Sequence, residues 1–350
     1  MSRPPITGTL TDTLAAARRQ RGRRRAGQLA ALAAVVLALV ALTLMVGQSV
    51  TPPGDVARVL LGRDVPGAGF TIGTLRAPRA LMSLLTGLSF GLAGAAFQTM
   101  LRNPLASPDI IGISFGASGA AVAGIVFFGL SGSAVAPVAI AGGLGVALGI
   151  YALAWRGGGV AGARLILIGI GMAAMMQSVI SYSLLKASTW SQNEAIRWMA
   201  GSVNGATLAE AVPLALALAV CGGVLLLRAR DLEALRLGDD TAAALGIRVG
   251  WLRITVLLAA VGLVAFATAA AGPIAFVAFL SGPIVSRLIG PGRSLLLPAA
   301  LGGAVLVLGA DWIGQFALPM RFPVGIVTGA LGAPWLVYLI ARSNRVGAAS

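Results

Sequence analysis

The sequence predicts an all-α membrane protein that crosses the bilayer with about ten transmembrane helices. Hydrophobic residues make up 57% of the chain and charged residues only 11%, whereas soluble domains carry about 25% charged residues. Apolar runs of about 20 residues, the length needed for one crossing, recur along the 350 residues. The 48 glycines suit helices in lipid, because small residues allow their backbones to approach closely. About ten crossings with short loops leave no room for a large soluble domain.

The first predicted span follows the basic segment RRQRGRRR at residues 18–25, which favours a cytoplasmic N-terminus and can contact anionic lipid. A cleaved signal peptide is the alternative. Against it, the apolar run Leu29–Val46 is long enough to span and shows no clear cleavage site. Arginines lie at the ends of the other apolar runs. The ten expected spans are residues 29–48, 80–100, 109–129, 134–155, 164–186, 208–228, 251–270, 273–289, 295–314 and 323–341.

The arginine distribution supports this topology. Arginine supplies almost all of the net charge of +15, and ten crossings place 19 of the 26 basic residues on the cytoplasmic side, as the positive-inside rule requires. Arginines so scattered favour loops of a membrane protein over a nucleic-acid patch. We therefore expect a basic cytoplasmic tail at 1–28, one transmembrane domain at 29–342 and a cytoplasmic tail at 343–350. The basic residues expected outside are Arg58, Arg63, Arg76, Arg79, Lys186, Arg197 and Arg321.

Residue counts exclude several kinds of chemistry. The chain has no histidine and one cysteine, Cys221, so a Ser-His-Asp triad, a thiolate cluster and a histidine metal site are excluded. The single lysine, Lys186, has no glycine loop before it and cannot complete a phosphate-binding P-loop. We therefore expect no cofactor, no metal site and no catalysis by this chain, with any ATP hydrolysis in a separate subunit.

One long polar stretch, residues 228–253, separates the sixth and seventh predicted spans on the cytoplasmic side. Leucines precede Gly238, and Asp239 and Asp240 then open a second short helix, where acidic side chains are favourable. Gly246 is placed to end that helix. The segment therefore predicts two short helices joined by a glycine bend, whose apolar side chains need a cytoplasmic protein partner.

Five motifs, in order along residues 30–342, resemble the FecCD-type permeases, the membrane subunits of ABC importers for iron–siderophores, haem and vitamin B12. Each motif alone is weak, but their order on a ten-span topology is specific. The motifs are Arg76-Ala-Pro-Arg79 with Gln98 and Arg102-Asn-Pro-Leu-Ala106, then Trp198-Met-Ala-Gly-Ser202, Leu235-Arg-Leu-Gly-Asp239 through Gly246, Gly272-Pro-Ile-Ala-Phe276, and Phe322-Pro-Val-Gly325 through Pro334.

The resemblance implies the architecture of a type II ABC importer permease in the bacterial inner membrane. It implies a second permease subunit, with a different paralogue favoured, two copies of a cytoplasmic ABC ATPase, and a periplasmic or lipid-anchored siderophore-binding protein. Arg76 and Arg79 match the family's outward arginines and would pair with glutamates of that binding protein. Loop 228–250 matches the coupling helices that contact the ATPase. The residues assigned to coupling are Leu232, Leu235, Leu237, Gly238, Asp239, Asp240, Leu245 and Gly246.

Departures from the family pattern narrow the expected cargo. Many members have a Pro-His pair where this chain has Ser281-Gly-Pro283, and many have a glutamate where Arg321 stands. Gln315 replaces a further outward arginine. These differences disfavour a vitamin B12 permease and resemble the ferric-catecholate, enterobactin-like branch. Transport of another chelate, haem or cobalamin, is the alternative.

The fifth predicted span is the most polar and the richest in methionine, and methionine forms adaptable apolar walls. We expect it to line a path along which the chelate slides without a tight site, although packing against neighbouring helices explains the same residues. The expected path residues are Gln98, Met172, Met175, Met176 and Gln177.

An ion-coupled secondary transporter is a further alternative, because that class uses acidic residues inside the membrane. Asp311 is the one acid well placed in an apolar run. A lone acid near the end of a span is more typical of a structural partner. Dependence of transport on ATP or on a proton gradient would separate the two classes.

Overall fold

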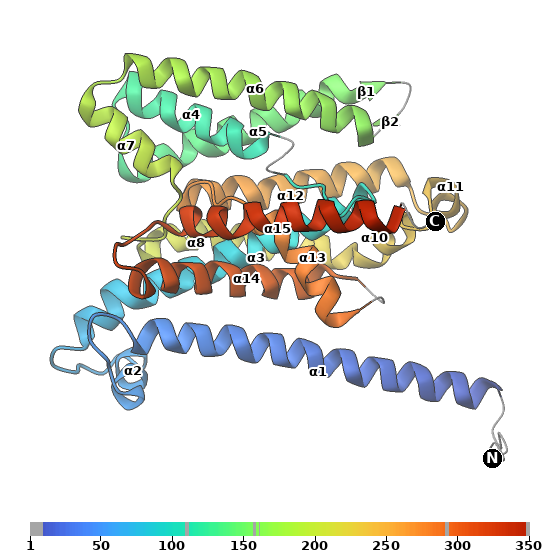
Figure 1. The fold of residues 1–350 in the computed structure, drawn as a ribbon, viewed down its shortest axis with the longest axis horizontal. Coiled ribbons are helices and arrows are strands. Elements are labelled where there is room, and N and C mark those ends of the chain that lie inside the picture. Colours follow the sequence, from blue (N-terminus) through green and yellow to red (C-terminus); the bar gives the residue numbers. More distant parts are fainter. Residues whose placement is uncertain (1–9, 109–111, 157–158, 161, 291–293, 348–350) are drawn as a thin grey trace.

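The computed structural model describes residues 10–108, 112–156, 159–160, 162–290 and 294–347. Its long helices run roughly along one common direction and form a bundle (Figure 1). Within the described residues, seven helical segments are long and apolar enough to cross a membrane, and three shorter apolar helices accompany them. These ten segments correspond in order to the ten predicted spans.

The described chain consists of long apolar helical segments, shorter apolar helices, connecting helices and one pair of short strands. The seven long segments are α1 (Leu10–Met45), η1 with α3 (Phe70–Met100), η2 with α5 (Gly132–Ala154), α6 (Gly162–Lys186), α8 through η3 and α9 (Leu208–Leu227), α12 (Val249–Ala271) and α14 with η4 (Leu296–Ala317). The shorter apolar helices are α4 (Ile113–Phe128), α13 (Val277–Ile289) and the apolar part, Val324–Tyr338, of α15 (Val324–Gly347). The connecting helices are α2 (Pro53–Leu60), α7 (Thr189–Met199), α10 (Ala229–Leu235) and α11 (Asp239–Ala244). Two short strands, β1 (Trp155–Arg156) and β2 (Gly159–Val160), pair antiparallel.

Both ends of the described chain lie at the same end of the bundle as α10 and α11, whereas α2 and α7 lie at the opposite end (Figure 1). We call these the α10–α11 end and the α2–α7 end. Helices α4, α5, α6 and α7 form a group along one side, and α1 lies beside α14 on the other (Figure 1). An even number of crossings explains why the two termini share an end.

Helix α3 is the centre of the bundle and packs against α12, α13 and α14. Its glycines allow this contact, because a side chain on Gly91 would overlap the carbonyl group of Ala299 in α14. A side chain on Gly94 would overlap Ala278 of α13 in the same way. Small residues therefore bring the backbones together, as expected for helices in lipid.

Three predicted boundaries differ from the structure, and one of them is that of the second span, which begins at Phe70 in η1 instead of residue 80. The segment expected as a separate tail at 1–28 is helical from Leu10 and continuous with the first span, because residues 10–28 are rich in alanine and arginine and contain no proline. The eighth span begins at Val277 instead of residue 273, since Gly272 and Phe276 both have positive φ, which a helix does not allow. Residues 1–9 and 348–350 of the two expected tails lie outside the described residues.

We expect Gly87→Ala to destabilise the bundle. The added methyl group would lie 2.5 Å from the carbonyl oxygen of Gly303 and 2.6 Å from the Cα of Ala304, so α3 and α14 would have to separate. Overpacking of this kind costs about 1–3 kcal/mol. The measurement is the free energy of unfolding in mixed micelles. Gly145→Ala in α5, where nothing lies within 4 Å of the new Cβ, is the control. Equal stability of the two variants would contradict the packing argument.

Candidate functional site

The loop between α9 and α12 has the predicted form of two short helices with a glycine bend. Gly238 lies between α10 and α11 with φ +109°, and Gly246 follows α11 with φ +84°. Both values favour glycine because a Cβ is strained there. Two ion pairs fix the second helix, since the carboxylate of Asp239 lies 2.9 Å from Arg253 of α12 and 3.5 Å from Arg102. The loop is thus attached to the bundle through its first acidic residue.

The leucines of this loop divide into two groups. Leu232 and Leu235 of α10 are only 1% exposed and belong to the main hydrophobic core. Leu237 and Leu245 are 66% and 64% exposed, and Asp240 is exposed beside them. Leu232 and Leu235 therefore anchor the loop to the bundle, and the surface available to another protein is formed by Leu237, Asp240 and Leu245.

Arg76 is buried at the α2–α7 end, although its motif predicted an outward role. Its Nη1 donates to the carbonyl oxygens of Leu44 at 3.0 Å and Met45 at 3.1 Å, and to Thr51 Oγ1 at 3.2 Å. Its Nη2 donates to the carbonyl oxygen of Ser49 at 2.7 Å. These bonds satisfy carbonyl groups that the end of α1 leaves free. Arg76 therefore fixes the turn that follows the first span.

Arg79 forms a two-bond ion pair with Asp311 across the bundle. Its Nε and Nη2 each lie 2.7 Å from one carboxylate oxygen, the geometry in which arginine holds a carboxylate most strongly. The side chains are 14% and 4% exposed, and Nη1 also reaches Asn204 Oδ1 at 3.4 Å. Asp311 thus has a structural partner that joins α14 to α3.

The five predicted path residues lie in two different places. Gln98 of α3 donates to the carbonyl oxygen of Phe279 in α13 at 2.9 Å and packs against Gly282. Met172 and Met176 of α6 pack against the core, whereas Met175 and Gln177 are exposed on the other side of the helix. The structure therefore separates Gln98 from the exposed face of α6.

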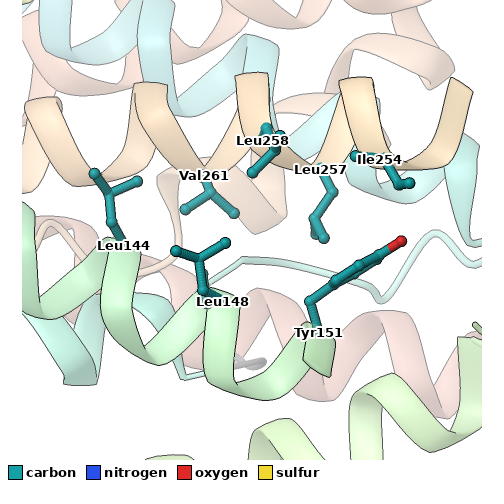
Figure 2. Close-up of a pocket in the computed structure, with 8 residues that line it drawn as sticks. Leu144, Leu148, Tyr151, Ile254, Leu257, Leu258 and Val261 are labelled. Atoms are coloured by element: carbon teal, nitrogen blue, oxygen red, sulfur yellow. The ribbon is translucent and has the colours of Figure 1, made fainter. Parts of the chain in front are cut away.

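The structure contains an apolar pocket and a polar groove. The pocket, of about 100 Å³, lies between α5 and α12 (Figure 2). Its lining residues are Leu144, Ala147, Leu148, Tyr151, Ile254, Leu257, Leu258 and Val261. The groove, of about 430 Å³, lies where the α10–α11 loop joins α9 and α12. Its lining residues are Arg228, Asp231, Gly246, Ile247, Arg248, Trp251, Leu252 and Thr255. Among the described residues, no group of three or more Cys, Asp or Glu side chains could hold a metal ion.

Comparison with known proteins identifies the family to which this chain belongs. The sequence matches the FecCD transport family over residues 35–342. The chain belongs to this family. It is 37% identical over 314 residues to the achromobactin transport system permease protein CbrC of Dickeya dadantii, covering 89% of this chain and 90% of that protein. It is 40% identical over 275 residues to the ferric enterobactin transport system permease protein FepG of Escherichia coli, covering 77% and 82%.

A solved structure confirms the fold. The chain resembles an inward-facing conformation of a putative metal-chelate type ABC transporter with a TM-score of 0.78 and 24% identity, over 91% of this chain and 99% of the other. This FecCD permease is therefore an all-α polytopic membrane protein. It is a non-catalytic transmembrane subunit of an ABC transporter, and the ATPase is a separate subunit.

Sequence reasoning did not identify the Arg79–Asp311 pair or the groove at the loop. One signal for the pair was available, because an acid inside an apolar run needs a counter-charge, and Arg79 is one of the few basic residues expected at the same end. The burial of Leu232 and Leu235 also had a signal, since residues three apart on a helix share a face.

We expect Asp311→Asn to destabilise this FecCD permease by about 3–5 kcal/mol, because removing one partner of a buried pair leaves the Arg79 charge uncompensated. The free energy of unfolding in micelles measures the loss. The control is Asp55→Asn, which breaks the exposed pair between Arg58 and Asp55 and should have little effect. The exchange Arg79→Asp with Asp311→Arg should recover part of the stability. If Asp311→Asn unfolds like the control, the pair is not structural.

Proposed function

We propose that this permease forms, together with a second and different permease subunit, the path by which a ferric siderophore enters the cytoplasm. The observation that carries the proposal is the similarity to permeases of achromobactin and ferric enterobactin transport over most of the chain. The α10–α11 end is cytoplasmic in this proposal, because the arginine-rich start of α1 and the arginines of the loop lie there, and the positive-inside rule favours that orientation.

The ATPase contacts the α10–α11 loop in this proposal. Leu237 and Leu245 are the exposed apolar side chains on either side of α11, and the glycines on both sides of α11 set its angle to the bundle. Asp239 connects α11 to Arg253 of α12, so a force on the loop reaches a spanning helix directly. Of the predicted coupling residues, Leu237, Asp240 and Leu245 form the contact surface, and Leu232, Leu235, Gly238, Asp239 and Gly246 support it.

In this proposal, Arg79 is the residue that binds the siderophore-binding protein at the α2–α7 end. Its side chain is partly exposed, so an acidic residue of the binding protein can share it with Asp311. Arg76 has four partners within the chain and contributes by fixing the turn beside Arg79. The charge-exchanged variant of Arg79 and Asp311 tests this role, because it keeps the ion pair and loses the arginine at position 79.

The exposed face of α6 lines the path or meets the second permease in this proposal. Most of α6 is uncovered, and Leu167, Ile170 and Met175 are each at least half exposed. Gln177 and Ser178 add polar groups to that face. Few polar groups converge on that face, which supports a path along which the chelate slides without a tight binding site. An ion-coupled transporter is disfavoured because Asp311 is already paired with Arg79.

Uptake of an iron-55-labelled siderophore tests the transport function in cells that lack the gene for this chain. The wild-type gene should restore uptake, and uptake should stop on ATP depletion but continue when the proton gradient alone is collapsed. Leu237→Ser with Leu245→Ser should abolish uptake and ATPase binding, because the apolar contact surface is lost. Leu61→Ser, at an exposed leucine of the opposite end, should restore uptake fully. Full uptake by the double variant would contradict the proposed ATPase contact.

Cysteine labelling tests the path. In a Cys221→Ser background, Gln177→Cys should react with a water-soluble maleimide in the assembled transporter, and the rate should change with bound nucleotide. Met176→Cys should stay unreactive, because Met176 packs against Gly119 of α4 and the core. A Gln177→Cys variant as unreactive as Met176→Cys would place this face of α6 in lipid or in a dry helix contact.

A further inference from the structure

The polar groove at the base of the α10–α11 loop has a positive lining. Arg228 begins the loop and Arg248 ends it, and both side chains are exposed. Asp231 is the one acid in the lining and lies 3.2 Å from Arg228. Among the described residues, Arg248 forms no ion pair. The groove therefore keeps one net positive charge and suits an anionic ligand.

Exposed apolar side chains beside the groove place it at the membrane surface. Leu227, the residue before Arg228, is 84% exposed at the end of α9, and Trp251 in the first turn of α12 is 67% exposed. A leucine exposed at the end of a spanning helix suits contact with lipid, and tryptophan prefers the interface between headgroups and chains. The two arginines thus lie on the headgroup side of this apolar surface.

The apolar pocket continues the same surface into the bilayer. Ile254 and Leu258 of α12 follow Trp251 by three and seven residues, so the three side chains lie along one side of the helix. Ile254 and Leu258 also line the pocket, where they face Leu148 and Tyr151 of α5 (Figure 2). The rings of Tyr151 and Trp155 contact each other at a tilt, with centroids 5.6 Å apart, which adds a second aromatic group near this interface.

We propose that the groove binds the phosphate of an anionic phospholipid, with one acyl chain running past Trp251 over Ile254 and Leu258 into the pocket between α5 and α12. Arginine binds phosphate with charge-assisted hydrogen bonds, and a volume of about 430 Å³ is within the range of small-ligand sites. Since Arg228 and Arg248 begin and end the α10–α11 loop, one bound headgroup connects the two ends of the loop. This site is independent of the transported cargo.

The test uses the full-length protein purified in detergent, titrated with phosphatidylglycerol, phosphatidylcholine of the same chain length, or inorganic phosphate. We expect clear preference for phosphatidylglycerol, measured by native mass spectrometry and by thermophoresis. Arg228→Gln with Arg248→Gln should weaken phosphatidylglycerol binding about tenfold or more, since each arginine near anionic lipid contributes substantially. Phosphatidylcholine binding should not change.

The matched control is Arg58→Gln with Arg63→Gln at the opposite end, where one arginine is paired with Asp55 and the other is exposed, as in the groove. This control should bind phosphatidylglycerol like the wild type. Asp231→Asn removes the competing carboxylate and should tighten binding severalfold, so the proposal remains testable if the double groove variant does not fold.

Three results would overturn the proposal. These are equal affinity for the two lipids, unchanged phosphatidylglycerol binding in both groove variants, and full displacement of phosphatidylglycerol by equimolar inorganic phosphate, which would indicate a site for soluble phosphate. Loss of ATPase binding in the double variant with unchanged lipid affinity would assign the groove to the ATPase instead.

Discussion

Close backbone contact between α3 and its neighbours is the constraint on which the bundle depends. Helices in lipid gain little from the hydrophobic effect and are held by close packing and polar contacts. Gly87, Gly91 and Gly94 let α3 touch the backbones of α13 and α14, and α12 packs on another side. With α3 fixed in this way, its two ends have defined positions, so that Arg79 meets Asp311 at one end and Arg102 meets Asp239 at the other.

The two ends of the bundle use arginine differently. At the α2–α7 end, Arg76 and Arg79 are held by carbonyl groups and by a buried carboxylate, and each ties segments that are distant in the sequence. At the α10–α11 end, most arginines are exposed and form at most exposed ion pairs. Buried arginines must be paired because an isolated buried charge is costly. Exposed arginines can instead bind lipid or protein, which is the basis of the proposed roles of that end.

Local patterns in the sequence were sufficient to predict several features correctly. The number and order of the apolar helices follow from run lengths, and the bend at Gly238 follows from glycine between two short helical stretches. The family follows from five ordered motifs and is confirmed by the match over residues 35–342. The roles of Arg76, Leu232 and Leu235 were predicted from motif position, and motif position did not reveal that all three side chains are buried.

The sequence by itself determined the membrane class, the absence of histidine chemistry and the two-helix loop, because composition and short-range spacing encode these properties directly. Only the tertiary structure decided that Asp311 is the partner of Arg79, since the two residues are 232 positions apart. Only the tertiary structure also decided that Arg228, Arg248 and Trp251 form one groove, because that groove exists only where α9, the loop and α12 meet. Contacts between distant segments depend on how the helices pack, and packing is a property of the whole bundle.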